Sequence, residues 1–169
     1  GKEAMAPHSL TMTMIGAALL WVGWFGFNAG SNLESNSVTS LAIMNTFTAT
    51  AGAGVAWMLA EWMVKGHPSM LGLVSGVVAG LVAVTPASGF AGPVGSMFLG
   101  IVAGVCCFFF VAYVKNYFKL DDSLDVFGVH GIGGIVGALG TAIVASPALN
   151  GFGVGGADYS ISGQFTIQA

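Results

Sequence analysis

Five long apolar stretches without a charged side chain occupy most of this chain and leave few folds open to it. Each reaches about 20 residues or more, the length that an α-helix needs to cross the hydrocarbon core of a bilayer. A helix satisfies its own backbone hydrogen bonds in lipid, which an open sheet cannot do. The predicted spans are residues 10–29, 38–60, 70–90, 94–114 and 126–146.

We therefore predict an all-α fold, a polytopic membrane helical bundle with five transmembrane helices in residues 1–148. The polar segments between the spans are short, so helices that follow one another should be antiparallel neighbours. Residues 149–169 are too polar to span, and we interpret them as an extracytoplasmic loop that leads to a missing span.

The composition argues against a soluble domain. Charged residues make up 7% of the chain, against about 25% in soluble domains. Four lysines and seven acidic residues cannot supply the polar surface of a soluble protein of 169 residues. We expect a multi-pass protein of the cell membrane, in contact with the lipid bilayer and without a nucleic-acid partner.

The lysines predict how the chain is oriented. Lys2 precedes the first span, Lys65 follows the second, and Lys115 and Lys119 follow the fourth, so all four fall on one side. Because cytoplasmic loops carry the excess of lysine and arginine, the amino terminus is expected in the cytoplasm and the carboxyl terminus outside. Aromatic residues near these lysines predict an interfacial belt on the same side; they are Trp57, Trp62, Tyr113, Tyr117 and Phe118.

Glycines recur at a spacing of four residues within three of the spans. They stand at 72, 76 and 80, at 100 and 104, and at 133, 134 and 137. This spacing places them on one helix face and lets neighbouring backbones approach closely. We expect tight packing within one bundle.

His130 is a lone ionisable residue near the start of the last span. Such a residue inside a membrane marks a pathway or a reactive site by default. The alternative interpretation is a histidine that hydrogen-bonds a neighbouring backbone carbonyl. Asp125 precedes it as a candidate helix N-cap.

A second cluster closes the first span. Trp24 and Phe27 lie three residues apart and can offer ring faces to a cation, with Ser31 one turn further as an oxygen acceptor. The alternative is an ordinary interfacial aromatic belt. The three histidines, His8, His67 and His130, are far apart and suggest no metal site.

Three motifs together resemble the ammonium transporter family (Amt/Mep/Rh), in its Amt branch. They are Gly23-Trp-Phe-Gly-Phe-Asn-Ala-Gly-Ser31, Val84-Thr85-Pro86 and Asp122-Ser-Leu-Asp-Val-Phe-Gly-Val-His130-Gly, in family order. The chain looks like a fragment that covers spans six to ten of an eleven-span protein. The resemblance implies a channel-like ammonium/ammonia transporter and no enzyme. It also implies a homotrimer without a cofactor, with methylammonium as a further substrate and a PII-type regulator that binds a tail missing here.

The resemblance also implies roles for individual residues. Trp24 and Ser31 match the external site that recruits ammonium, and Phe27 matches a gate of the pore. The pore-lining positions are Leu20, Thr85, Val126 and His130, the last being one of two paired histidines. The structural motif around the histidine comprises Asp122, Asp125, Phe127, Gly131 and Gly134.

Two other classes compete with this reading. An intramembrane serine hydrolase could use Ser75 and His130, although Leu73 stands where a Gly-x-Ser-Gly motif has glycine. A purely structural membrane subunit leaves the Trp24 to Ser31 cluster and His130 unexplained.

Overall fold

The computed structural model describes residues 6–149, 151–152 and 159–169. Its main helices are α1 (Leu10–Asn28), α2 (Ser37–Lys65), α3 (Met70–Val84), α4 (Pro93–Phe109) and α6 (Ile132–Val144), with the short α5 (Lys115–Tyr117) and α7 (Ile161–Gln168). Single 3₁₀ turns are η1 (Gly30–Asn32), η2 (Thr85–Ala87) and η5 (Pro147–Leu149), and wide π turns are η3 (Phe110–Val114) and η4 (Phe127–Gly131). In the described residues there is no strand, and the all-α prediction is confirmed.

Among the described residues, four helical stretches are long and apolar enough to cross a membrane. They are Leu10–Asn32, Met70–Ala87, Pro93–Tyr117 and Phe127–Val144, and they overlap four of the five predicted spans. The remaining predicted span, 38–60, lies inside α2, which has 29 residues but a more polar sequence. Four of its polar side chains, those of Asn45, Thr46, Thr50 and Glu61, are buried among the other helices, which explains how a helix of lower hydropathy sits at the centre of this bundle.

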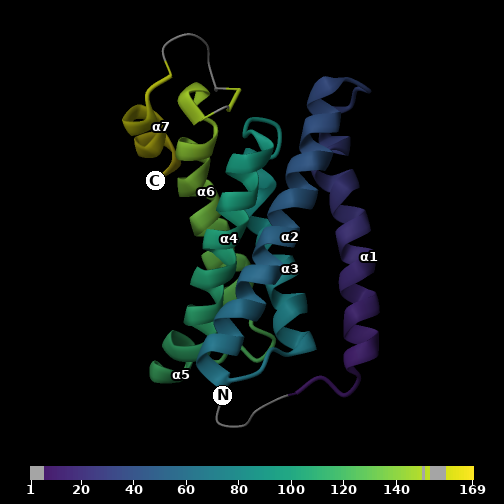
Figure 1. The fold of residues 1–169 in the computed structure, drawn as a ribbon. Coiled ribbons are helices and arrows are strands. Elements are labelled where there is room, and N and C mark those ends of the chain that lie inside the picture. The colour runs from purple at the N-terminus through teal and green to yellow at the C-terminus, as the bar shows by residue number, and fades with distance from the viewer. Residues whose placement is uncertain (1–5, 150, 153–158) are drawn as a thin grey trace.

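α2 lies against both α3 and α4 (Figure 1), and small residues form these contacts. A methyl group at Gly100 of α4 would lie 2.1 Å from the carbonyl oxygen of Ala49 in α2, and one at Gly104 would lie 2.5 Å from that of Ala53. From the other side, a methyl group at Gly80 of α3 would lie 2.8 Å from the Ala49 oxygen. The prediction of close packing at these glycines is confirmed.

The third set of glycines behaves unevenly. A methyl group at Gly137 would lie 2.3 Å from the carbonyl oxygen of Ala83 in α3, so α6 approaches α3 closely there. Gly133 has ordinary contacts, and the nearest atom to a methyl group at Gly134 would be Val82 Cγ1 at 4.0 Å. Close packing is therefore wrong for Gly134, because it faces a wider gap than Gly137.

Buried amide groups hold the chain segments at the end of the bundle where α1 ends and α4 begins. Asn45 Nδ2 donates to the carbonyl oxygens of Ser88 at 2.8 Å and Ala91 at 2.7 Å, which holds the turn between α3 and α4 on α2. Asn28 Nδ2 donates to Thr46 Oγ1 at 3.0 Å and ties the end of α1 to the same helix. Hydrogen bonds of this kind fix the position of irregular backbone that hydrophobic contact alone would leave loose.

The lysines that the structure describes gather at the opposite end, where α2 ends and α5 lies (Figure 1). The aromatic belt predicted there is wrong for Trp57, which is 4% exposed and packs edge-on against Phe108 with ring centroids 5.8 Å apart. Its position on the inner face of α2 places it in the core. Trp62 and Tyr117 are exposed, as the belt requires.

Glu61 follows the predicted span 38–60 and is a buried carboxylate at this end. It accepts hydrogen bonds from Lys65 Nζ at 3.0 Å, Ser69 N at 3.0 Å and Ser69 Oγ at 2.9 Å. Burial raises the pKa of the carboxyl, but these hydrogen bonds outweigh burial and hold the pKa below its ordinary value of 4.5. The carboxylate therefore joins α2 to the start of α3 in its charged form.

The final segment contains a helix that we did not predict. α7 begins after Ser160, whose hydroxyl accepts from Gly163 N at 3.3 Å, and Tyr159 donates to the carbonyl oxygen of Ala142 in α6 at 2.6 Å. The helix has eight residues, too few to span. Much of the predicted loop, at 150 and 153–158, lies outside the described residues.

Replacing Gly100 by alanine should destabilise the bundle, because the added methyl group overlaps the α2 backbone. Overpacking of this kind costs about 1–3 kcal/mol, and we expect a lower midpoint of thermal unfolding in detergent. Gly16→Ala is the matched control, because nothing lies within 4 Å of a methyl group at that helical position. An unfolding midpoint for Gly100→Ala equal to that of Gly16→Ala would contradict the packing argument.

Candidate functional site

One face of α1 carries most of the residues that the sequence singled out in the first span. Leu20, Trp24 and Phe27 recur every three or four residues, so they share that face, and Ser31 follows in η1. The rings of Trp24 and Phe27 lie 5.5 Å apart at an angle of 60°. Trp24 Nε1 donates to Thr85 Oγ1 at 2.9 Å, and the hydroxyl of Thr85 in turn donates to the carbonyl oxygen of Leu81 at 2.8 Å. The fold thus brings Thr85 of the second motif to the first.

Ser31 and Trp24 have different partners. The Ser31 hydroxyl donates to the carbonyl oxygen of Phe27, which leaves its own oxygen able to accept. Seven residues separate Ser31 from Trp24, a rise of roughly 10 Å along a helix. Phe27 lies between them, so the two side chains do not form one compact cluster.

Ser31 faces a hollow of about 390 Å³ near the end of α1. Its lining combines aromatic, amide and hydroxyl groups from α1, α2 and the turn between α3 and α4. The lining residues are Phe27, Asn28, Ser31, Asn32, Val38, Ala42, Thr85, Ser88, Gly89 and Phe90. A mixture of ring faces and neutral oxygen atoms suits a small cation that has lost part of its hydration shell.

Sequence reasoning did not identify Phe90, which lines the same hollow as Ser31. Phe90 belongs to the turn that Asn45 holds on α2, far from Ser31 in the chain. The proline and glycines around it indicated a turn, but nothing in the sequence indicated which helix that turn would meet.

His130 lies in the wide turn η4 with its side chain exposed. It makes no hydrogen bond to any of the residues described, so the alternative in which a backbone carbonyl satisfies the ring is wrong for this structure. Val126 precedes it by four residues and is also exposed, as is Leu20 on α1. His130 does not line the hollow beside Ser31.

The start of the histidine helix differs from our prediction. The carboxylate of Asp122 accepts from Phe127 N at 3.1 Å and Gly128 N at 2.9 Å and so caps the turn. Asp125 is not the side-chain cap, because its backbone adopts a left-handed conformation, with φ of 54°, and its carboxylate pairs with Lys115. The predicted N-cap at Asp125 is therefore wrong, and the path of the backbone gives the cap to Asp122.

Two further motif residues pack together at this turn. A methyl group at Gly131 would lie 2.8 Å from the ring of Phe127, so this position has little room for a side chain. The Phe127 ring lies 5.6 Å from that of Phe110 in η3. Gly134 takes no part in this packing.

The serine hydrolase alternative is not supported. Ser75 donates its hydroxyl to the carbonyl oxygen of Leu71 at 2.9 Å, within its own helix, and not to His130. A nucleophilic serine needs a general base within hydrogen-bond reach. In the part of the chain that the structure describes, no group of three His, Cys, Asp or Glu side chains is placed to hold a metal ion.

Replacing Thr85 by valine should leave the indole N–H of Trp24 without its acceptor. An unsatisfied donor of this kind costs about 1–3 kcal/mol, so we expect a lower midpoint of thermal unfolding. Thr166→Val is the matched control, because the Thr166 hydroxyl is exposed and donates to the carbonyl oxygen of Ser162 in its own helix at 2.9 Å. Equal midpoints for the two variants would show that the Trp24 bond contributes nothing to stability.

Comparisons with known proteins agree on one family. The model described as "Ammonium Transporter Family" matches residues 1–169. An ammonium transporter of Aquifex aeolicus is 50% identical over 148 residues, covering 88% of this chain and 35% of the relative. One of Bacillus subtilis is 47% identical over 156 residues, covering 92% and 39%.

Solved structures of similar fold carry related names. A "Sensor Amt Protein" has a TM-score of 0.86 at 32% identity, over 95% of this chain and 39% of that one. Mep2 of Saccharomyces cerevisiae has a TM-score of 0.79 at 37% identity, over 85% and 34%. The chain therefore spans about two-fifths of the length of the proteins it matches, or less.

Proposed function

The chain belongs to the ammonium transporter family, and we propose that it forms part of a channel-like ammonium/ammonia transporter. Family membership and four membrane-capable helices identify it as a multi-pass membrane protein rather than an enzyme. The main support for this proposal is the environment of His130. Its imidazole has no hydrogen-bond partner among the described residues, and it lies on a helical stretch, Phe127–Val144, that has no charged residue.

We place the lysine end of the bundle in the cytoplasm of a cell that carries the protein in its plasma or inner membrane. Lys65 and Lys115 lie at this end, and Ser31 lies near the other. With this orientation, the hollow beside Ser31 opens to the outside. Five helices cross the membrane in this proposal, α2 being the fifth, and residues 149–169 return on the outer side.

The outer hollow recruits ammonium. The oxygen of Ser31 and the ring faces of Trp24 and Phe27, which lie 5.5 Å apart, replace part of the hydration shell of the ion. Water is a poorer ligand there because it has no positive charge for the rings to attract and fewer donors than ammonium.

Conduction follows loss of the proton near Phe27. A bare ammonium ion is costly to place among apolar side chains, whereas neutral ammonia is not. The molecule then passes the exposed side chains of Leu20, Val126 and His130. His130 relays the proton together with a second histidine that the remainder of the transporter supplies. This chain matches only 35% and 39% of the length of two relatives, which supports a pore that the rest of the transporter completes.

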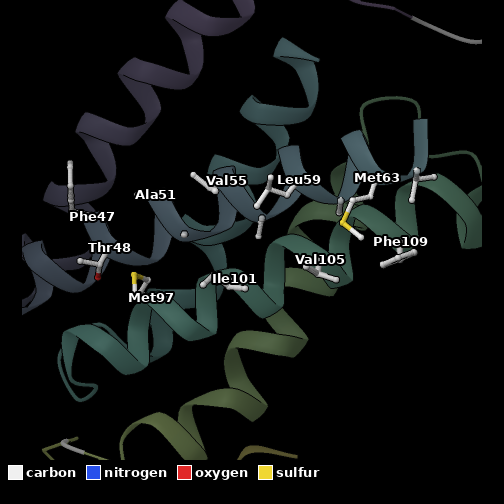
Figure 2. Close-up of a pocket in the computed structure, with 14 residues that line it drawn as sticks. Phe47, Thr48, Ala51, Val55, Leu59, Met63, Met97, Ile101, Val105 and Phe109 are labelled. Atoms are coloured by element: carbon white, nitrogen blue, oxygen red, sulfur yellow. The ribbon is translucent and has the colours of Figure 1, made fainter. Parts of the chain in front are cut away.

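An apolar groove of about 690 Å³ supports assembly as a homotrimer. Figure 2 shows Phe47, Val55 and Leu59 of α2 opposite Met97 and Ile101 of α4 along this groove. An exposed apolar surface of this size marks contact with another protein surface or with lipid, and we propose that a neighbouring copy fills it. A PII-type regulator binds only through a tail outside this chain.

Substitution of His130 by alanine tests the relay. We expect uptake of labelled methylammonium by cells with the complete transporter to lose its coupling to charge movement, because the proton has no carrier. His67→Ala is the matched control, an exposed histidine in the turn between α2 and α3. One charge moved per ammonium with unchanged selectivity over potassium in His130→Ala would overturn the relay.

Substitution of Ser31 by leucine tests recruitment at the outer hollow. Loss of an oxygen that binds a cation should raise the KM for uptake by about tenfold, with a smaller effect at saturating substrate. Ser40→Leu, at an exposed position on α2, should leave the KM unchanged. An unaltered KM in Ser31→Leu would remove this serine from the recruitment site.

A further inference from the structure

We infer that Lys115 is a positioning residue for His130, an inference that rests on the proposed role of His130 in conduction. Lys115 begins α5, fifteen positions before the histidine, and its side chain turns back onto the loop that starts the histidine helix. Its Nζ donates to the carbonyl oxygen of Asp122 at 2.7 Å and forms an ion pair with the carboxylate of Asp125. The two side chains of the pair are 20% and 24% exposed.

The loop needs an external anchor because its backbone is unfavourable. Lys119 and Asp125 both have φ of 54°, in the left-handed region that disfavours residues with a side chain. Asp125 nonetheless holds the first turn, since its carbonyl oxygen accepts from Val129 N at 2.8 Å. Lys115 therefore forms its ion pair with Asp125, the residue that has the unfavourable φ and whose carbonyl oxygen accepts the hydrogen bond of the first helical turn.

Lys115 also reaches the side-chain cap of the histidine helix. It holds the carbonyl group of Asp122, and the carboxylate of the same residue accepts from the amides of Phe127 and Gly128. A displacement of Asp122 would free the two amides that begin the wide turn η4. A continuous set of polar contacts thus runs from the ammonium group to the turn that contains His130.

The wide turn is the feature that makes this anchoring important for function. A π turn holds one residue more than an α turn, and such turns are rare within helices and frequently lie at functional sites. Relaxation to an α-helix by one residue would rotate His130 by about 100° around the helix axis. The direction of the imidazole therefore depends on whatever maintains η4.

A second wide turn packs against the first and leads directly into Lys115. η3 ends at Val114, and its Val111 fits against Gly128, where a methyl group would lie 2.6 Å from Val111 Cγ2. The rings of Phe110 and Phe127 lie 5.6 Å apart. Apolar contacts from η3 and polar contacts from Lys115 therefore both hold η4 in place. The two sets of contacts come from the continuous helical stretch Pro93–Tyr117.

Lys65 provides a matched control at the same end of the bundle. It pairs with Glu61 at 3.0 Å, four residues earlier in its own helix, and its side chain is 50% exposed. Glu61 keeps its hydrogen bonds from Ser69 when the lysine is removed. Lys65 therefore tests the loss of a lysine ion pair that does not reach η4.

The experiment compares Lys115→Met, Lys115→Arg and Lys65→Met in the complete transporter. The first readout is hydrogen exchange of the amides at 127–131, relative to those at 137–144 in the same helix. Because hydrogen bonds to charged groups are lost, we expect exchange at 127–131 to become about tenfold faster in Lys115→Met, without a change at 137–144. Lys115→Arg should restore slow exchange, and Lys65→Met should not alter it.

The second readout is methylammonium uptake with and without His130. Lys115→Met should lower uptake by roughly tenfold, as misplacement of a functional group does, yet add little to the loss already caused by His130→Ala. Unchanged exchange at 127–131, or faster exchange throughout the helix, would overturn the positioning inference. Asp125→Asn removes the same ion pair and replaces Lys115→Met if that variant does not fold.

The proton relay by His130 and the positioning role of Lys115 are refuted by different measurements. Normal coupled transport by His130→Ala would refute the proton relay while leaving the local exchange result intact. Additive losses of uptake in Lys115→Met and His130→Ala would refute positioning while leaving the relay intact.

Discussion

The close approach of α3 and α4 to Ala49 and Ala53 of α2 is the contact on which the rest of the bundle depends. Lipid removes the hydrophobic drive between helices, so their association relies on backbone proximity and on polar contacts. Gly80 and Gly100 make that proximity possible on opposite sides of Ala49. Larger residues there would separate the helices and displace the turn that Asn45 holds on α2.

Separate anchors at the two ends of the bundle hold the parts of the proposed path. At one end, Asn28 and the bond between Trp24 and Thr85 fix α1, so that Phe27 and Ser31 face the hollow beside Ser31. At the lysine end, the Asp122 cap and Lys115 hold the turn that contains His130. The described residues share no hydrogen bond between these two groups, so substitutions at one end should leave the geometry of the other unchanged.

Two expectations are wrong for one physical reason. The position of Trp57 near a lysine predicts an interfacial belt, but its face of α2 points into the core. The position of Asp125 before the apolar run predicts a helix cap, but its left-handed backbone leaves that role to Asp122. Both outcomes depend on a neighbour or a backbone angle that the local sequence does not specify. The helix α7 differs, because its short and polar sequence carries no apolar periodicity that would predict it.

The helical membrane bundle, the family and the small-residue faces follow from the amino-acid sequence alone, because apolar length, motif order and spacing are local properties of the chain. The packing of α2 against both α3 and α4, and the bond from Trp24 to Thr85 across 61 residues, are seen only in the folded structure. The periodicity of small and apolar residues predicts that a helix face is buried, but it does not identify the helix that packs against it. Partners are selected when whole helices pack together, so the surroundings of Ser31 and His130 appear only in three dimensions.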